Sequence, residues 1–505
     1  MSSRHRVLAF AALGVVASAR LASAQCPDGT PPPCGRAVTP PPRSIAVLTF
    51  ENVTRDTAAQ YLAEGLPDQI LTRLGGVGRL TVVSRTVVRR LRNSDQLSVQ
   101  QIGRALNAAY LINGTIRAAG GRVHVSVEAL RSGTGEAIWS ETFDRATDSL
   151  LGVEEAVATA VATGVAGRLS PRERRALGSR ATLNGRAYAQ FLRGNVLLAR
   201  RTPATMWSAI QAYRGATEED STFADAFGRL ATAYTLCVNW GCGGSADTLL
   251  MLSRQAATRA LHLDPHSSDG WMGRALGLVF SAFFRSSGPA AGDDDSVLAS
   301  FAAFRRALAL NPRNDEAWHQ YGFALSLVND SAAFDAYHRA LALDPTRAVT
   351  YGDISWLLHL EGHNERALAT VDSGLALEPE EGYRWVRVLY RVTAGDTAGA
   401  LADAQRAPNV MFSPAVLAAF AHDTGATRMM RAWLAARECV GNLGALYLLW
   451  IGQQELAIAG LLPCGPSLMT RWQLRVPLLA PLLDDPRIRA LRAASDSIAA
   501  RARWR

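Results

Sequence analysis

The sequence predicts an α+β protein that is mainly α-helical, in which a small α/β domain precedes an α-α superhelical solenoid. Two observations carry this expectation. A Leu-x-Leu-x-Pro string occurs four times, ending at Pro265, Pro312, Pro345 and Pro379, with spacings of 47, 33 and 34 residues. Ahead of it, strand-like apolar runs alternate with helical patterns. Repeats of this length indicate helical hairpins that stack, because one unit alone cannot bury its apolar face.

Residues 1–24 have the pattern of a secretion signal. Arg4 and Arg6 precede an apolar run that is too short to span a bilayer comfortably, and Ala22-Ser-Ala24 offers small residues at the cleavage positions. We therefore expect cleavage after Ala24 and a periplasmic or secreted protein. The alternative is a membrane anchor formed by an uncleaved N-terminal segment. Residues 25–43 are rich in proline and are predicted to form an extended linker.

The six cysteines fall into three local pairs. An even number of locally paired cysteines in an exported chain favours disulfides, with free buried thiols as the alternative. No pair has the C-x-x-C spacing and no histidine cluster lies beside one, so we expect no metal site and no cofactor. The disulfide candidates are Cys26 with Cys34, Cys237 with Cys242, and Cys439 with Cys464.

The α/β domain is predicted over residues 44–169. Its expected helices show apolar residues at helical spacing, and its expected strands are short runs rich in Val, Ile and Thr that are separated by Gly-containing turns. Ser170-Pro171 is expected to end the last helix. The predicted strands cover residues 45–50, 80–83, 109–118, 122–132 and 136–142, and the predicted helices cover 57–74, 98–107 and 149–169.

The repeats are predicted over residues 184–379. The second and third units are longer than the others, and we expect their extra residues between the two helices of each hairpin, where loops tolerate insertions. Beyond Pro379 the pattern weakens, so residues 380–470 are expected to hold degenerate hairpins. Residues 471–505 are expected to form a C-terminal cap.

Within these units the marked positions resemble those of the tetratricopeptide repeat (TPR). Trp318 and Tyr351 occupy the fourth position of their units, and Tyr337 and Ala340 lie eight and five residues before Pro345, where small and aromatic residues bring two helices together. The proline ends the second helix. The resemblance implies an array that binds proteins or peptides on its concave face.

The α/β domain contains the strings Ser44-Ile-Ala-Val-Leu-Thr-Phe-Glu-Asn52, Tyr61-Leu-Ala-Glu-Gly-Leu66 and Ile138-Trp-Ser-Glu-Thr-Phe-Asp144. On these strings it resembles the amino-terminal domain of TolB, of the bacterial type that pairs this module with a TPR array. In that family a winged helix, a kinase or a cyclase usually precedes the module, whereas a secretion signal stands in that place here.

The sequence contains none of the common catalytic motifs. Gly75-Gly-Val-Gly78 lacks the lysine of a phosphate-binding loop, and neither H-E-x-x-H nor G-x-S-x-G occurs. We therefore expect that the protein is not an enzyme. The net charge of +9 comes entirely from arginine. A basic run, which includes Arg73 and Arg79, could bind an anionic polymer, but we favour a solvated helix face and expect no nucleic acid.

A partner-binding groove is predicted on the first helices of the central hairpins. The second, fifth, ninth and twelfth positions of each unit should point into it, and a mixed aromatic and polar lining suits an extended peptide or a helix. The alternative is that some of these side chains pack only between helices. The residues predicted to line the groove are Met272, His319, Phe323, Trp356, His359, Tyr383 and Tyr390.

Together these patterns predict an exported, non-catalytic protein that acts as a protein–protein interaction or scaffold module in the bacterial cell envelope. The alternative is an envelope sensor whose α/β domain binds a small molecule or an anionic polymer. Contact with a membrane is expected only through the N-terminal anchor.

Overall fold

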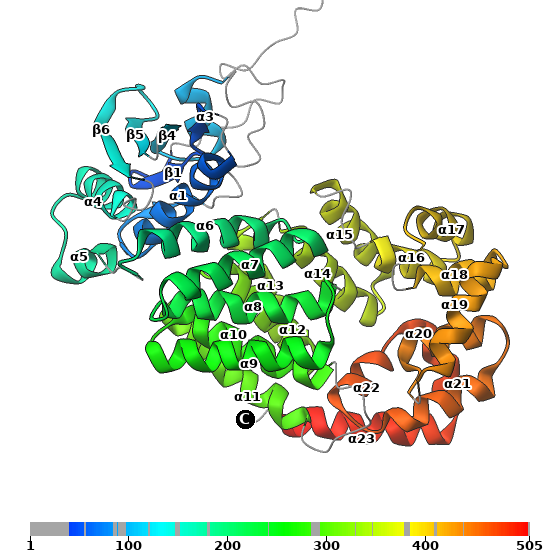
Figure 1. The fold of residues 1–505 in the computed structure, drawn as a ribbon. Helices are drawn as coiled ribbons and strands as arrows, with labels where there is room; N and C mark the ends of the chain where they lie inside the picture. The colour runs from blue at the N-terminus through cyan, green and yellow to red at the C-terminus, as the bar shows by residue number, and fades with distance from the viewer. Residues whose placement is uncertain are drawn as a thin grey trace, which may run out of the picture.

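A computed structural model of the chain describes residues 40–54, 57–83, 88, 97–119, 122–146, 152–178, 182–240, 242–283, 293–328, 330–345, 347–377, 384–408, 412–437 and 439–502. A small α/β module is followed by a long array of helices, which confirms the predicted fold class (Figure 1). The secretion signal, most of the Pro-rich linker and the Cys26–Cys34 pair lie outside the described residues.

One mixed sheet forms the centre of the α/β module. Strand β1 is parallel to β3 and β4, and all four of its residues are buried, as expected of a short apolar strand covered on both faces. Strands β4, β5 and β6 continue as an antiparallel meander in the order β3-β1-β4-β5-β6. The strands are β1 (Ser44–Val47), β2 (Glu51–Asn52), β3 (Thr81–Val82), β4 (Tyr110–Ala119), β5 (Arg122–Arg131) and β6 (Ala137–Ala146).

Helices cover both faces of this sheet. The helices α1 (Thr57–Gly75) and α4 (Val153–Ala166) share the main core with the sheet, whereas α3 (Val99–Ala105) packs in a small separate cluster. The prediction that Pro171 ends the last helix was wrong. Gly167, at φ +75°, ends α4, and Pro171 is the first residue of α5 (Pro171–Gly178). A proline is well placed there, because the N–H it lacks has no partner in a first turn.

From residue 185 onward the chain forms antiparallel helical hairpins that stack into a TPR solenoid (Figure 1). The hairpins are α6 (Gly185–Ala199) with α7 (Pro203–Glu219), α8 (Ala224–Trp240) with α9 (Ala246–Leu263), α10 (Ser268–Phe283) with α11 (Asp293–Leu310), α12 (Asp315–Ser326) with α13 (Asp330–Leu343), α14 (Ala348–Leu360) with α15 (Asn364–Leu377), α16 (Arg384–Thr393) with α17 (Thr397–Arg406), α18 (Ser413–Phe420) with α19 (Thr424–Ala435), and α20 (Gly441–Trp450) with α21 (Gln454–Leu461).

A recurring hydrogen bond explains the aromatic residue at the fourth position of the central units. The Nε1 atoms of Trp271 and Trp318 and the hydroxyl of Tyr351 each donate to the carbonyl oxygen of the proline six residues earlier, at 2.9 Å. The bond fixes the turn that joins one hairpin to the next. It also satisfies a carbonyl that the end of the preceding helix leaves without a helical partner.

A recurring close contact explains the tyrosines of the second helices. A Cβ atom added to Gly322 would lie 2.6 Å from the ring of Tyr337, and one added to Gly194 would lie 2.5 Å from Tyr213. Each tyrosine therefore occupies the space that a side chain on the first helix would need, and only glycine allows the helices to approach this closely.

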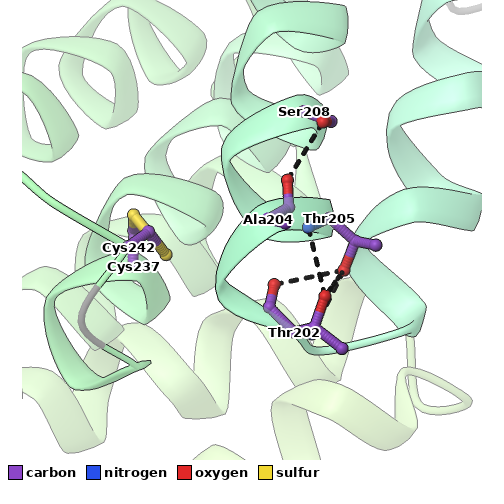
Figure 2. Close-up of a disulfide and its surroundings, with 6 residues drawn as sticks. All are labelled: Thr202, Ala204, Thr205, Ser208, Cys237 and Cys242. Carbon is purple, nitrogen blue, oxygen red and sulfur yellow. Dashed lines mark hydrogen bonds between the residues drawn. A yellow bond between two sulfur atoms is a disulfide. The ribbon is translucent and has the colours of Figure 1, made fainter.

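The insertions in the second and third units lengthen helices. Helices α8 and α9 have 17 and 18 residues, whereas α12 and α13 have 12 and 14. The Cys237–Cys242 disulfide lies at the end of α8, near the N-terminus of α7 (Figure 2). There the Oγ1 atom of Thr202 accepts from the N–H of Thr205, and Oγ1 of Thr205 accepts from the N–H of Thr202. Together these two bonds form a capping box.

The C-terminal segment closes the solenoid. After the 3₁₀ turn η3 (Leu462–Cys464) it forms α22 (Leu468–Gln473), the 3₁₀ segment η4 (Pro477–Asp484) and α23 (Pro486–Ala502). Helix α23 runs back toward α11, so that the C-terminus lies near the middle of the array (Figure 1). Leu468 belongs to the core of the front repeats and Leu474 to that of the rear repeats, so α22 joins the two.

The α/β module and the first repeats share one hydrophobic core. Buried residues of α1, α4, α6 and α8 form a single cluster, and a Cβ atom on Gly65 of α1 would lie 3.2 Å from the side chain of Leu192 on α6. The module is therefore packed against the array directly.

Candidate functional site

The first helices of successive hairpins lie side by side and form the inner face of the solenoid. Helix α10 packs against α8 and α12, and α14 lies between α12 and α16. The loop between α6 and α7 and the C-terminal segment both reach this face. We call the part on α8, α10 and α12 the charged half, and the part on α14 and α16, with α22 over it, the aromatic half.

An ionic network forms the centre of the charged half. Glu316 on α12 pairs with Arg201 from the α6–α7 loop and with Arg347 before α14, and Arg347 also pairs with Asp315. The side chains of Arg201, Glu316 and Arg347 are only 11%, 10% and 12% exposed. Although burial raises the pKa of the Glu316 carboxyl, the two guanidinium groups lower it far more, so it stays charged.

A second pair extends the network toward the front of the array. Arg229 on α8 donates from Nε to Asp269 on α10 over 3.1 Å. Asp225, one turn earlier on α8, accepts from the hydroxyl of Ser267. Burial, and next the charge of Asp269, raise the pKa of Asp225 to about 6. The charged half is therefore tied together across neighbouring hairpins.

His319 connects the two halves. Its Nδ1 atom lies 3.0 Å from the hydroxyl of Thr350, and its Nε2 atom lies 3.6 Å from the carboxylate of Asp353 on α14. Burial lowers the pKa of His319 to about 3, so the imidazole is neutral at pH 7. Burial raises the pKa of Asp353 to about 7, against a smaller opposing effect of Arg201.

The aromatic half is a cluster of rings around Trp356 of α14. The Trp356 ring centroid is 5.6 Å from Trp385 on α16, 6.3 Å from Phe412 before α18 and 5.1 Å from Trp472 on α22. Aromatic pairs at these distances stabilise a core beyond the area that they bury. The C-terminal segment thus covers the predicted groove with a tryptophan of its own.

His359, one turn beyond Trp356, is fully buried. Its ring lies 4.6 Å from that of Tyr390, and its Nδ1 atom lies 3.0 Å from Oδ1 of Asn364. Asn364 donates from Nδ2 to the carbonyl oxygen of Tyr390, which leaves its Oδ1 to accept from His359. Burial lowers the pKa of His359 to about 4. The imidazole is therefore neutral, with its proton on Nδ1.

The structure corrects the expected groove lining. Phe323 is half-buried with its ring 5.7 Å from Phe280, and Tyr383 lies outside the described residues. The other five side chains are at most 5% exposed. They lie on the inward faces that the repeat positions predicted, but neighbouring helices and the C-terminal segment cover those faces. These buried residues are Met272, His319, Trp356, His359 and Tyr390.

Sequence reasoning missed three residues of this face. Arg201 lies in the loop between two helices, at φ +47°, and reaches a carboxylate 115 residues later. Asp353 falls between the expected inward positions. Trp472 belongs to the segment expected to form only a cap. The sequence offered one signal, and it concerned Asp353. This residue is the one carboxylate in the otherwise largely apolar α14 (Ala348–Leu360).

The basic run on and after α1 contributes to internal ion pairs. Arg73 donates to Glu154 of α4 over 3.0 Å, and Arg79 pairs with Glu173 of α5 at 2.9 Å. The hydrogen bond from Arg79 lowers the pKa of Glu173 to about 2. Both arginines thus hold the helices of the module together. The remaining arginines of the run, at 85, 89, 90 and 92, lie outside the described residues.

Two of the three expected disulfides fall within the described residues. Cys237 is joined to Cys242 and Cys439 to Cys464. Within the same part of the chain, no group of three or more His, Cys, Asp or Glu side chains is arranged to hold a metal ion. None of the described helices combines the length and the apolar character needed to cross a bilayer.

Comparisons with known proteins give one sequence relative. The chain is 25% identical over 248 residues to a Rhizobium meliloti (strain 1021) protein named "Putative adenylate cyclase 3", a match that covers 48% of this chain and 42% of that relative. The chain thus spans less than half of the relative's length. No protein-family model matches. This relative overturns the expectation that the protein is not an enzyme, because it shares almost half of the chain and carries a cyclase name.

Solved structures resemble parts of the chain. The TPR protein TTC0263 of Thermus thermophilus is 18% identical and covers 41% of this chain and 97% of its own, with a TM-score of 0.33. PilF of Pseudomonas aeruginosa is 14% identical, with coverages of 49% and 96% and a TM-score of 0.32. TolB of Acinetobacter baumannii is 18% identical, with coverages of 26% and 31% and a TM-score of 0.20. At such scores the likenesses add nothing to the hairpin geometry described above.

Proposed function

We propose that this chain is an interaction module whose solenoid binds a protein or peptide along its inner face, within the cell envelope of a bacterium. The support comes from the fold. Stacked hairpins present a continuous concave surface to which each unit adds side chains, and such surfaces suit extended or helical ligands.

The observation that carries this proposal is the inner face itself. Charged side chains from α8, α10 and α12 are fixed there by pairs that join different hairpins, and Arg229 and Asp315 keep 28% and 33% of their side-chain surface exposed. On α14, the Asp353 side chain is 26% exposed. A partner would meet groups whose positions are already set, which lowers the entropic cost of binding.

The experiment is an affinity purification with the tagged full chain, followed by hydrogen exchange on the purified complex. We expect the partner to protect amides of α12, α14 and α16. Phe323→Ala is the test variant, because Phe323 is half-buried and sits on α12. Trp207→Phe on α7 is the control, because Trp207 is exposed and lies on a second helix. Protection confined to the α/β module, or the recovery of no partner, would contradict the proposal.

We propose an exported location on two observations. The N-terminal sequence has the pattern of a secretion signal, and the described part of the chain contains two disulfides, which persist in oxidising compartments. Mass spectrometry of the protein from fractionated cells tests this. A chain that begins at Gln25 in the periplasmic fraction is expected, a membrane fraction with an intact N-terminus indicates the anchored alternative, and a reduced cytoplasmic protein contradicts both.

A second candidate function rests on the α/β module, which we propose to be TolB-N-like on the residues quoted above. An open groove of about 680 Å³ lies between β6 and α4. Trp139 and Ile138 form one wall, and the outward face of α4, with Thr159 and Thr163, forms the other. A groove with an aromatic wall and two threonine hydroxyl groups is a suitable place for a small ligand.

Thermal-shift measurements on the full chain test this second function, because the module shares its core with the first repeats. We expect a ligand of the groove to raise the midpoint of wild type but not of Thr159→Trp, which fills the groove. Glycans, nucleotides and anionic lipid headgroups are the probes. If none of them shifts the midpoint of wild type, the second function is rejected while the first is untouched.

A further inference from the structure

One face of α14 carries polar groups that the protein itself does not satisfy. Asp353, Trp356 and His359 are spaced by three residues, so their side chains are neighbours along one side of the helix. The Nε1 atom of Trp356 and the Nε2 atom of His359 are both buried without a hydrogen-bond partner among the described residues. Buried groups of this kind are rare in folded proteins and call for an explanation.

The chemistry of the two buried atoms is complementary. Trp356 offers an N–H donor. Because His359 donates from Nδ1 to Asn364, its Nε2 atom offers only a lone pair. The centroids of the two rings are 6.0 Å apart. One donor and one acceptor on neighbouring rings match in kind the two polar groups that a peptide main chain presents, one C=O and one N–H.

Asp353 adds a carboxyl group beside this pair. No hydrogen bond to its carboxylate occurs among the described residues, and the one ionisable side chain that forms a pair with it there is His319, whose neutral imidazole lies 3.6 Å away. The arginines of the charged half are already engaged, since Arg201 and Arg347 both pair with Glu316. The carboxylate is therefore free to accept a cation from outside the chain.

Trp472 lies over this face. Its ring is 5.1 Å from that of Trp356, and it belongs to the six-residue helix α22. The neighbouring Arg471 anchors α22, because it donates to the carbonyl of Leu327 at 3.0 Å and pairs with Asp496 at 2.9 Å. Trp472 is thus one of three rings that pack on Trp356, with Trp385 and Phe412, and it is the one that the C-terminal segment contributes.

We propose that this face of α14, beneath Trp472, is a binding site for a basic peptide segment. The peptide main chain accepts from Trp356 and donates to His359, and an Arg or Lys side chain pairs with Asp353. Trp472 moves aside when the segment enters. This inference rests on the proposed function and specifies its ligand, and the opposite charge of Asp353 is what selects a basic segment.

Fluorescence anisotropy on the full chain tests the site with three labelled dodecapeptides. In each one Ala alternates with a second residue, which is Arg in the Arg–Ala peptide, Gln in the Gln–Ala peptide and Glu in the Glu–Ala peptide. Trp472→Ala is expected to strengthen binding of the Arg–Ala peptide about tenfold by opening the face. Asp353→Asn should weaken that peptide about tenfold and leave the Gln–Ala peptide unchanged. Trp356→Phe, which keeps an aromatic ring but removes the N–H donor, should weaken binding of both peptides several-fold. Trp207→Phe is the matched control and should change nothing.

The Asp353→Asn and Trp356→Phe comparisons are also made with Trp472 intact, so the outcome does not depend on whether Trp472→Ala folds. Equal binding of the Arg–Ala and Glu–Ala peptides, unchanged binding by the two variants, or no Arg–Ala binding by any folded protein overturns the inference. If a partner purified with wild type binds both variants equally well, the site is wrong but the proposed function stands. If the peptides bind as expected and no partner is found, the site is supported but the proposed function is contradicted.

Discussion

The two halves of the inner face handle buried polar groups in opposite ways. In the charged half, Glu316 is shared by two arginines that come from different loops, so each of these three buried charges has an opposite charge in contact. In the aromatic half, Trp356 and His359 each retain a buried polar atom without a partner. Burying an ion pair costs desolvation energy, which the attraction between the two charges offsets when their geometry is good. Burying a donor or acceptor without a partner costs desolvation energy that nothing in the free protein offsets.

This difference separates structure from function. A network of ion pairs fixes the relative positions of hairpins. An unsatisfied group lowers stability, so its retention is understandable where a ligand completes it. The charged half therefore sets the shape of the groove, and the aromatic half is where we expect binding.

Removing Glu316 is expected to have the largest effect on stability. Glu316→Ala leaves Arg201 and Arg347 buried without their shared carboxylate, and we expect a loss of about 3–5 kcal/mol in the free energy of unfolding. Urea unfolding followed by circular dichroism measures it. The control is Glu218→Ala, because Glu218 forms an exposed pair with Arg214, and its midpoint should hardly move. Equal midpoints for the two variants would show that the network is not structural.

Removing the Cys439–Cys464 disulfide is expected to cause the second-largest loss of stability. It closes a separation of 25 residues at the rear of the array, and the loss of loop-closure constraint in the unfolded chain predicts a cost of about 3 kcal/mol for the double serine variant. The Cys237–Cys242 bridge closes a separation of only 5 residues and predicts about 2 kcal/mol. The reverse order in urea unfolding would mean that local packing outweighs loop entropy.

Asp353→Asn tests the link between the two halves through pH. The folded pKa of Asp353, about 7, lies above its ordinary value, so its contribution to stability is present at low pH and is lost as pH rises through 7. The variant should equal wild type near pH 4 and exceed it by about 4 kcal/mol at pH 8. His359 and Asp225 titrate in both proteins and cancel in the difference, and the imidazole of folded His319, with a pKa of about 3, stays neutral between pH 4 and pH 8. A pH-independent difference would refute the assignment to Asp353.

Thr202→Ala should have the smallest effect on the free energy of unfolding. It removes the N-terminal cap of α7 next to Arg201, and loss of a threonine cap costs about 1 kcal/mol. If the cap also positions Arg201, the variant should lose less additional stability when combined with Glu316→Ala than the sum of the two single changes. Strict additivity in such a double-mutant cycle would show that the cap and the network are independent.

Local patterns identified the hairpins well because TPR units are held by contacts between residues close in sequence. The proline strings marked helix ends, and Trp318 and Tyr351 were expected at the positions where their polar atoms bond to the preceding proline. The inner face was harder to predict. The register showed which side chains point inward, but their burial depends on Arg201 and Trp472, which come from distant parts of the chain.

The sequence by itself determined the order of the α/β module and the repeats, the hairpin period and the local cysteine pairs, since each depends on the chemistry of neighbouring residues. Only the tertiary structure decided that residues 468–473 return to cover α14, that Glu316 meets two arginines, and that Trp356 and His359 keep unsatisfied polar atoms. Whether a group inside a solenoid is paired depends on how the superhelix closes on itself, and that closure is the sum of small rotations between units, which no single stretch of sequence records.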